Sequence, residues 1–281
     1  MIDLNEVSYR LREDVVNMIV AGKGGHIGGD MSVMEILVTL YMKHMNISPD
    51  NMDEDNRDRF IMSKGHSVEA LYAVLAEKGF FDIQDVISRF NKFGSPFIGH
   101  PNNKLPGIEM NTGSLGHGLP VSVGMALAGK TDHKNYRVYT VMGDGELAEG
   151  SVWEGIMAAS HYKLDNLCAV VDRNYLQISG NTEAIMGHDD LAERFRSFGW
   201  NVIVVKDGND IKQLDTAFAE AKTVKGMPTA VIANTVKGKG SAVMEGKANW
   251  HHKVPTAEEY VQLMEDFKQH KEEAQHESDT K

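Results

Sequence analysis

Two segments of the chain each end in a side chain that can bind a metal ion. The run Val141-Met-Gly143-Asp144-Gly145-Glu146 places a carboxylate between two glycines, directly after an apolar stretch. A second apolar stretch leads into Asn174, and 28 residues separate Gly145 from it. Mg²⁺ prefers oxygen ligands, usually one or two from the protein and the rest from phosphate and water. Glycines beside Asp144 would let the backbone approach a phosphate, so the two segments predict a site for a metal-bound diphosphate.

The Asp144-Gly145 pair has an alternative interpretation as a hairpin turn, because Asp-Gly after an alternating strand is a common hairpin signal. A helical stretch of about a dozen residues follows it before the next apolar run, which fits a parallel crossover better than a hairpin. Ligands of parallel sheets bind beyond the carboxyl ends of the strands. We therefore expect Asp144 and Asn174 to meet at one edge of a sheet.

Histidines next to glycines form the second chemical signal. The chain has 12 histidines, including those in Gly25-His26, Gly65-His66, Gly99-His100 and Gly116-His117-Gly118. One histidine in such a place more commonly caps a turn. Imidazole titrates near neutral pH, however, and can both move a proton and donate a hydrogen bond. Several of them in one chain indicate a reactive site.

The elements that must hold these residues follow from the apolar pattern. Apolar residues at three- and four-residue steps predict a helix over 4–20, a glycine-rich turn over 22–30 and a second helix with Ser32 as its N-cap. Valine- and isoleucine-rich runs then alternate with helical stretches. This alternation predicts an α/β fold, a doubly wound and mostly parallel sheet with helices on both faces. The expected strands are 59–62, 136–142, 167–171, 201–205 and 228–233, and the later helices are 68–77, 151–162 and 211–223.

The chain shows no internal repeat and no proline- or serine-rich linker, so residues 1–255 are expected to form one large domain. Thr256-Ala-Glu-Glu259 is a capping-box signature and predicts a helix to about Lys268. From His270 onward the residues are almost wholly polar, which predicts a loose tail. Residues 256–281 are thus expected to be a C-terminal helix and a polar tail.

Charge and composition exclude several classes of protein. The 281 residues contain 29 Lys plus Arg against 40 Asp plus Glu, a net charge of −11, which disfavours binding to nucleic acid. Cys168 is the only cysteine, so no internal disulfide can form and a reducing, cytoplasmic compartment is expected. No basic, apolar leader is visible at the start, and no run approaches 18 apolar residues. We expect neither secretion nor a membrane span.

The pattern Gly-Asp-Gly, about thirty residues, then Asn resembles the thiamine diphosphate signature. Further motifs appear in the order seen in the N-terminal half of transketolases, and the resemblance covers nearly the whole chain from Gly22 to Pro255. These motifs are Gly25-His26-Ile-Gly-Gly29, Ser63-Lys-Gly-His66, Gly99-His100-Pro101, Thr112-Gly-Ser-Leu-Gly-His-Gly118, Gly143-Asp-Gly-Glu-Leu-Ala-Glu-Gly150, Asp172-Arg-Asn174, Lys237-Gly-Lys-Gly240 and Trp250-His251.

This resemblance implies the diphosphate-binding (PP-type) domain of a thiamine enzyme, with thiamine diphosphate and Mg²⁺ or another divalent cation as cofactors. It implies Asp144 and Asn174 as side-chain ligands of the metal and the Leu176 carbonyl as a backbone ligand. It also implies that Glu149 joins a carboxylate network across the subunit interface. The remaining positions that would contact the cofactor are Leu115, Gly116, Gly143, Gly145, Glu146 and His66.

By the same resemblance, four histidines line the substrate channel. His26 and His251 would transfer the proton at the C3 hydroxyl of a ketose donor, while His66 and His100 would orient the first hydroxyls of the sugar. The carbon–carbon chemistry itself belongs to the cofactor. His252 is an alternative to His251, because the pattern Trp250-His-His-Lys253 permits a slip of one residue.

Two positions depart from the family pattern. His117 stands where full-length transketolases more often have glutamine, and Asp30 stands where small residues are usual. The other histidines are expected to be surface or packing residues; they are His44, His133, His161, His188, His270 and His276.

A transketolase also needs a domain that binds the pyrimidine ring, and the resemblance does not include one. The chain therefore resembles the N-terminal subunit of a split transketolase, acting on sugars or sugar phosphates with a C-terminal partner subunit, in a heterotetramer. Alternatives within enzymes are relatives that handle dihydroxyacetone, apulose phosphate or sulfonated sugars, and the two-chain 2-oxo acid dehydrogenases. A non-catalytic cofactor-binding module is a further alternative. A dinucleotide-binding oxidoreductase is disfavoured because the Gly-x-Gly-x-x-Gly pattern is missing.

Overall fold

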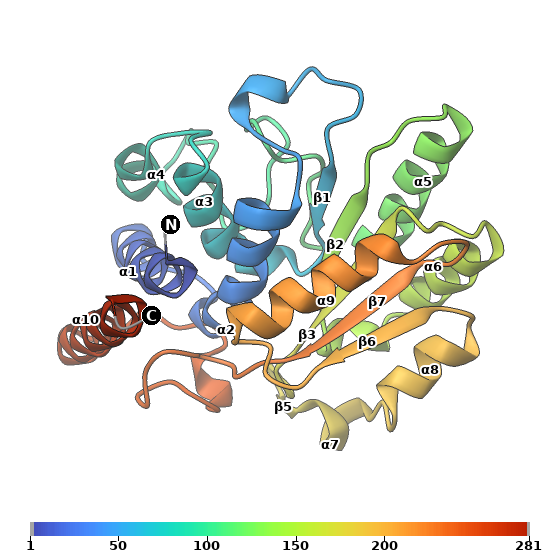
Figure 1. Ribbon diagram of the computed structural model, residues 1–281. Helices are drawn as coiled ribbons and strands as arrows, with labels where there is room; N and C mark the ends of the chain where they lie inside the picture. The colour runs from blue at the N-terminus through green and yellow to red at the C-terminus, as the bar shows by residue number, and fades with distance from the viewer. Residues whose placement is uncertain (1–2, 280–281) are drawn as a thin grey trace.

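A five-stranded parallel sheet forms the centre of the molecule in the computed structural model, which describes residues 3–279 (Figure 1). The strands lie in the order β1-β2-β3-β7-β6, and every neighbouring pair is parallel. The predicted parallel sheet is confirmed. The bounds are β1 Arg59–Met62, β2 Val138–Gly143, β3 Leu167–Arg173, β6 Asn201–Val205 and β7 Thr229–Asn234.

Helices cover both faces of this sheet, so its strands are buried on two sides. Alternate residues of one strand face different layers: Val141 of β2 belongs to one apolar cluster and Met142 to the other. One face carries α1 Leu4–Gly22, α2 Ile27–Thr39, α3 Val68–Glu77, α4 Ile83–Arg89, α9 Ile211–Thr223 and α10 Ala257–Asp279. The other carries α5 Gly118–Thr131, α6 Gly150–His161 and α8 Leu191–Ser197.

Short elements connect the layers near the carboxyl ends of the strands. The antiparallel pair of β4 and β5 follows β3, and α7 follows that pair. Single helical turns precede α3 and α6. The bounds are β4 Leu176–Gln177, β5 Gly180–Asn181, α7 Thr182–Met186, η1 Leu40–His44, η2 Pro49–Asn51, η3 Gly65–Ser67, η4 Gly145–Ala148 and η5 Ala248–Trp250.

Helix α2 begins earlier than predicted, at Ile27, with His26 rather than Ser32 in the N-cap position. Its first turn contains Gly28 and Gly29, where the sequence suggested a turn. Both glycines lie where a side chain would collide: a Cβ on Gly28 would stand 2.6 Å from the Trp250 carbonyl oxygen. The glycines therefore serve close packing inside a helix, and Ser32 is free to donate a hydrogen bond elsewhere.

Helix α10 continues to Asp279, so the predicted loose tail is wrong for the residues that the structure describes; 280 and 281 lie outside them. The helix packs along α1, with Phe267 fully buried. The Tyr260 hydroxyl donates to Asn17 Oδ1 at 2.9 Å, and the His270 ring stacks on Tyr9 with 4.7 Å between centroids. These contacts order a segment whose composition is mainly polar.

Within residues 3–279, no helix combines the length and the apolar character that crossing a membrane requires.

Candidate functional site

The predicted metal ligands come together at one corner of the sheet. Gly143 at the end of β2 is paired with Asp172 of β3, so Asp144 and Asn174 leave neighbouring strand ends. The Tyr175 backbone N–H donates to Asp144 Oδ2 at 2.7 Å and joins the two segments directly. Because β2 and β3 are parallel and α6 connects them, the hairpin interpretation of Asp144-Gly145 is wrong.

A left-handed turn brings the third predicted ligand to the same corner. Tyr175 has a φ of 62°, a conformation that non-glycine residues rarely adopt. The Leu176 backbone N–H then donates to Asn174 Oδ1 at 3.1 Å. This turn reverses the chain after β3 and keeps Leu176 beside Asn174.

Asp144 is 3% exposed, and its charge is poorly compensated. Burial raises the pKa of the Asp144 carboxyl to about 6, and the nearby Asp172 raises it further, while the amides of Tyr175 and Gly145 act in the opposite direction. In the described part of the chain no lysine or arginine forms an ion pair with Asp144. A bound dication would supply the missing positive charge, and the carboxylate, amide and carbonyl oxygens are the donor set that Mg²⁺ prefers. The residues present therefore fit a magnesium ion.

Asp172 organises the residues behind this corner. It is fully buried and forms an ion pair with Lys64. It accepts hydrogen bonds from Ser32 Oγ at 2.7 Å and from the Thr235 hydroxyl. Asn174 Nδ2 donates to Ser32 Oγ at 3.2 Å. Because the amide nitrogen of Asn174 is held by this group, its oxygen is directed to the other side.

Glu146 ties together two of the glycines that the resemblance assigned to the cofactor. The Gly116 N–H donates to Glu146 Oε1 at 2.9 Å, and the Gly143 N–H donates to Oε2 at 3.1 Å. The Ser63 hydroxyl also donates to Oε1. The carboxylate is 2% exposed and holds the loop before α5 against the end of β2. The Gly145 N–H donates to Asp144 Oδ1 at 2.9 Å, so this glycine lies at the predicted corner as well.

Gly116 and Glu149 lie against each other at the entrance to α6. Gly116 has a φ of +84°, and a Cβ there would stand 2.6 Å from Glu149 Cβ, so only glycine fits. The Ser151 hydroxyl donates to the Gly116 carbonyl at 2.9 Å. Glu149 itself is exposed, while Leu115 is half-buried. The carboxylate of Glu149 is thus accessible to a second chain.

The four predicted histidines form one cluster, although they come from four separate segments. The centroid of the His26 ring lies 5.3 Å from that of His66, 6.1 Å from His100 and 5.6 Å from His251. The His66 and His251 centroids are also 5.3 Å apart. All four rings are partly exposed. The sequence alone placed these residues in one site, and the structure brings them together.

His252 is a fifth ring beside this cluster. Its centroid lies 4.6 Å from that of His26, but its side chain is exposed. His251 contacts His26 and His66 and is hydrogen-bonded to Lys237 Nζ at 2.9 Å. The geometry makes His251 the inner residue of the pair and His252 the outer one.

The histidines of the cluster are uncharged at neutral pH. Burial lowers the pKa of His26 to about 4, and nearby His252 and His100 lower it further. Burial, with the charge of Lys237 next in size, lowers the pKa of His251 to about 3. Burial also holds the pKa of His66 well below its ordinary value and lowers that of His100. Neutral imidazoles can accept a proton from a hydroxyl group.

Lys237 connects the histidine cluster to the metal corner. Its Nζ donates to the Leu176 carbonyl at 3.0 Å and to Nδ1 of His251. Because Nδ1 accepts this bond, the ring proton of His251 resides on Nε2. Burial lowers the pKa of Lys237 to about 8. The sequence contained the motif Lys237-Gly-Lys-Gly240, but nothing in it indicated this bridging position.

His188 was expected to be a surface or packing residue, and it packs against the site. It is 3% exposed, and its Nε2 hydrogen-bonds to the Asp144 carbonyl at 3.0 Å. Burial lowers its pKa, so the neutral ring donates to that carbonyl. His188 therefore fixes the backbone of a predicted ligand from outside the sheet.

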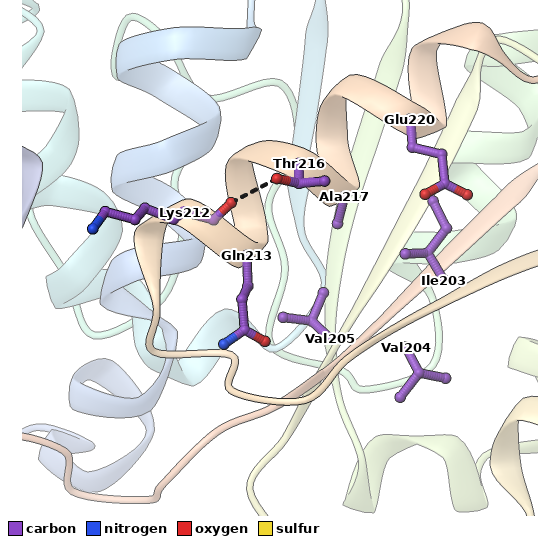
Figure 2. A pocket seen from close by; sticks show the side chains of 8 residues that line it. All are labelled: Ile203, Val204, Val205, Lys212, Gln213, Thr216, Ala217 and Glu220. Atoms are coloured by element: carbon purple, nitrogen blue, oxygen red, sulfur yellow. Dashed lines mark hydrogen bonds between the residues drawn. The ribbon is translucent and has the colours of Figure 1, made fainter.

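A separate hollow of about 410 Å³ lies at the sheet edge, between β6 and α9 (Figure 2). Val204 and Ile203 of the edge strand and Lys212 and Glu220 of α9 line it. The dashed line in Figure 2 is the bond from the Thr216 hydroxyl to the Lys212 carbonyl, at 2.9 Å. None of the residues with predicted chemistry lines this hollow, so the strand-end corner remains the candidate site.

Comparison with known proteins agrees with this geometry. Residues 5–275 match the family described as the thiamine diphosphate-binding domain of transketolase. The chain is 45% identical over 274 residues to one of the subunits named for the apulose-4-phosphate transketolase of Phocaeicola vulgatus, covering 98% of this chain and 97% of that protein. It is 40% identical over 258 residues to the 6-deoxy-6-sulfo-D-fructose transketolase subunit SqwG of a Clostridium species, covering 92% and 93%.

A solved structure shows the same fold. The transketolase of Leishmania mexicana superposes with a TM-score of 0.87 and 28% identity, over 100% of this chain and 46% of that one. The chain thus spans about half the length of the solved transketolase that it matches.

Proposed function

Since the chain belongs to the transketolase family, as a thiamine diphosphate-binding domain, we propose that it is the N-terminal subunit of a two-chain transketolase. The reaction transfers a two-carbon ketol unit from a ketose to an aldose, and turnover requires a partner subunit. The observation that carries this proposal is that Lys237 joins the Asp144–Asn174 corner to the histidine cluster. One site can therefore hold a diphosphate at one end and a sugar at the other.

At the diphosphate end, we assign Mg²⁺ to Asp144, Asn174 and the Leu176 carbonyl. When bound, thiamine diphosphate supplies the carbon nucleophile that breaks and forms the carbon–carbon bond. The raised pKa of Asp144 and the hard oxygen donors support a dication at this corner. The other residues that we assign to cofactor binding are Leu115, Gly116, Gly143, Gly145, Glu146 and His66.

At the sugar end, we assign proton transfer at the donor C3 hydroxyl to His26 and His251. His26 is neutral at pH 7, so its ring can accept the hydroxyl proton. His251 carries its proton on Nε2, so it can donate to a developing alkoxide. His66 and His100 then orient the first hydroxyls of the sugar by hydrogen bonds.

The partner subunit would carry the pyrimidine-binding domain, and the assembly would be a heterotetramer in the cytoplasm. Two relatives are named as subunits of transketolases, which supports a second chain. The exposed carboxylate of Glu149 is suited to a contact with that chain. In this proposal, residues 1–255 form the cofactor domain and residues 256–281 are an addition packed on it.

We propose that the substrates are sugars with an anionic group, a phosphate or a sulfonate. The names of two relatives specify apulose-4-phosphate and 6-deoxy-6-sulfo-D-fructose, and each of these compounds carries such a group. The neutral histidine cluster suits the hydroxyl end that both kinds of sugar share.

The test is to purify the chain with its partner and screen ketose phosphates and sulfonated ketoses with thiamine diphosphate and Mg²⁺. We expect release of an aldose two carbons shorter from the pair and none from the single chain. Steady ketol transfer by the single chain would contradict the two-chain proposal. His26→Ala in the complex should lose turnover, whereas His161→Ala, in the last turn of α6, should not.

A further inference from the structure

Two fully buried carboxyl groups, Asp30 and Glu69, lie behind the histidine cluster and have no part in the chemistry proposed above. Asp30 is in the first turn of α2, and Glu69 is in the first turn of α3. His26 occupies the N-cap position of α2, and His66 lies in η3, immediately before α3. Each carboxyl group therefore belongs to a helix that starts at one of the histidines.

Each carboxyl group reaches across to the start of the other helix. The Ala70 N–H, in the first turn of α3, donates to Asp30 Oδ1 at 3.1 Å. Glu69 Oε1 lies against Gly25, where an added Cβ would stand 2.4 Å from it. The His26 backbone amide lowers the pKa of Glu69, so this carboxyl group faces the N-terminal amide of α2. The two helix starts are thus capped reciprocally.

The remaining oxygens of the pair need a proton. In the described part of the chain, Asp30 Oδ2 and both Glu69 oxygens have no well-aligned N–H or hydroxyl donor. The two side chains hydrogen-bond to each other, and two buried carboxylates in contact cannot both be ionised. Lys64 is the cation that faces Asp30, but its Nζ is occupied by the Gly29 carbonyl and Asp172.

We propose that Asp30 and Glu69, joined by a shared proton, are positioning residues that set the spacing of His26 and His66. The pair locks the Gly25-His26 backbone to the first turn of α3, and so holds the two rings with their centroids 5.3 Å apart. Its importance for catalysis rests on the function proposed above. Its effect on geometry does not, and the two can be tested separately.

The geometric test uses the single chain and the NMR signals of its histidine rings. Wild type should show a nuclear Overhauser effect between the His26 and His66 rings. Glu69→Leu removes the proton link while nearly keeping the volume, so this effect should disappear and both ring signals should shift. Glu69→Gln keeps a donor to Asp30 and should retain the effect. The control is Glu77→Gln, which breaks the bond to Arg10 at the far end of α3.

The kinetic test uses the chain with its partner subunit. Glu69→Leu should lower kcat by about tenfold or more, because small displacements of reacting groups are costly. Glu69→Gln should stay within about threefold of wild type. If Glu69→Leu fails to fold by circular dichroism, Asp30→Ala replaces it, with the same expected losses.

The outcomes separate the two proposals. Unchanged ring signals in the variant without the link would overturn the positioning role. Disappearance of the Overhauser effect with full activity would overturn the importance of the pair for catalysis. An inactive wild-type complex, together with the expected disappearance of the Overhauser effect in Glu69→Leu, would count against the function only.

Discussion

The carboxylate of Asp144 is held by protein groups that do not neutralise it. Two backbone amides donate to it, but burial and Asp172 leave its pKa near 6, well above the ordinary value. Such a group gains from a metal ion more than a paired carboxylate would. Two predictions at the scale of single residues follow from this imbalance.

The first concerns removal of the charge. Asp144→Asn keeps the shape and loses the negative ligand, so Mg²⁺-dependent binding of thiamine diphosphate should weaken by about 100-fold or more. Isothermal titration with and without Mg²⁺ measures this directly. Asp132→Asn, an exposed carboxylate at the end of α5, serves as the control and should bind as wild type does. Equal affinity of the two variants would refute the ligand assignment.

The second concerns pH. Because the pKa of Asp144 is raised from 3.8 to about 6, the carboxylate is ionised at pH 7.5 and mostly protonated at pH 5. Mg²⁺ must then displace a proton, so its affinity should fall by roughly tenfold for each pH unit below about 6. Mg²⁺ titrations at pH 5, 6 and 7.5 check this. A flat affinity across this range would contradict a role for Asp144, and Asp144→Asn should remove the dependence.

At this scale, the sequence revealed the residues that stand in short motifs. Asp144, Asn174 and the four histidines could be found because glycines or strand ends mark them. Asp172 with Lys64, Lys237 with Leu176 and Asp30 with Glu69 could not be paired in advance. Each of these contacts joins segments far apart in the chain, and only the folded structure determines it.

At the scale of elements, strands were easier to predict than helix ends. The five strands of the sheet are short runs of apolar residues buried on both faces, which gives a clear signal. Helix α5 gave none, because small residues let it pack closely: a Cβ on Gly129 would stand 2.7 Å from the Tyr136 ring. The start of α2 was misjudged for the same reason, since its glycines imitate a turn.

Helix α10 provides a prediction at this scale. Phe267 is fully buried where α10 packs on α1, so Phe267→Ala should lower the free energy of unfolding by about 3–5 kcal/mol. Urea denaturation of the single chain measures it. Lys268→Ala, whose side chain is 72% exposed, should change it by less than about 0.5 kcal/mol. If both variants cost the same small amount, the helix does not contribute to the fold.

At the scale of the whole molecule, the chemical groups lie at one end of the sheet and face outward. The metal corner comes from the ends of β2 and β3, and the histidines come from loops around α2 and α3. All four histidine rings remain partly exposed, and Glu149 is exposed beside them. The arrangement is one wall of a site, as expected for a domain that covers 46% of a solved transketolase. In the proposed assembly, the opposite wall comes from the partner subunit.

A crystal structure of the two-chain complex with thiamine diphosphate and Mg²⁺ tests this most directly. We predict one cation between the Asp144 carboxylate, the Asn174 amide oxygen and the Leu176 carbonyl, with the diphosphate beside it and the thiazolium ring facing His26 and His251. A diphosphate bound away from the ends of β2 and β3, or a cation without Asp144 and Asn174 as ligands, would contradict the proposal.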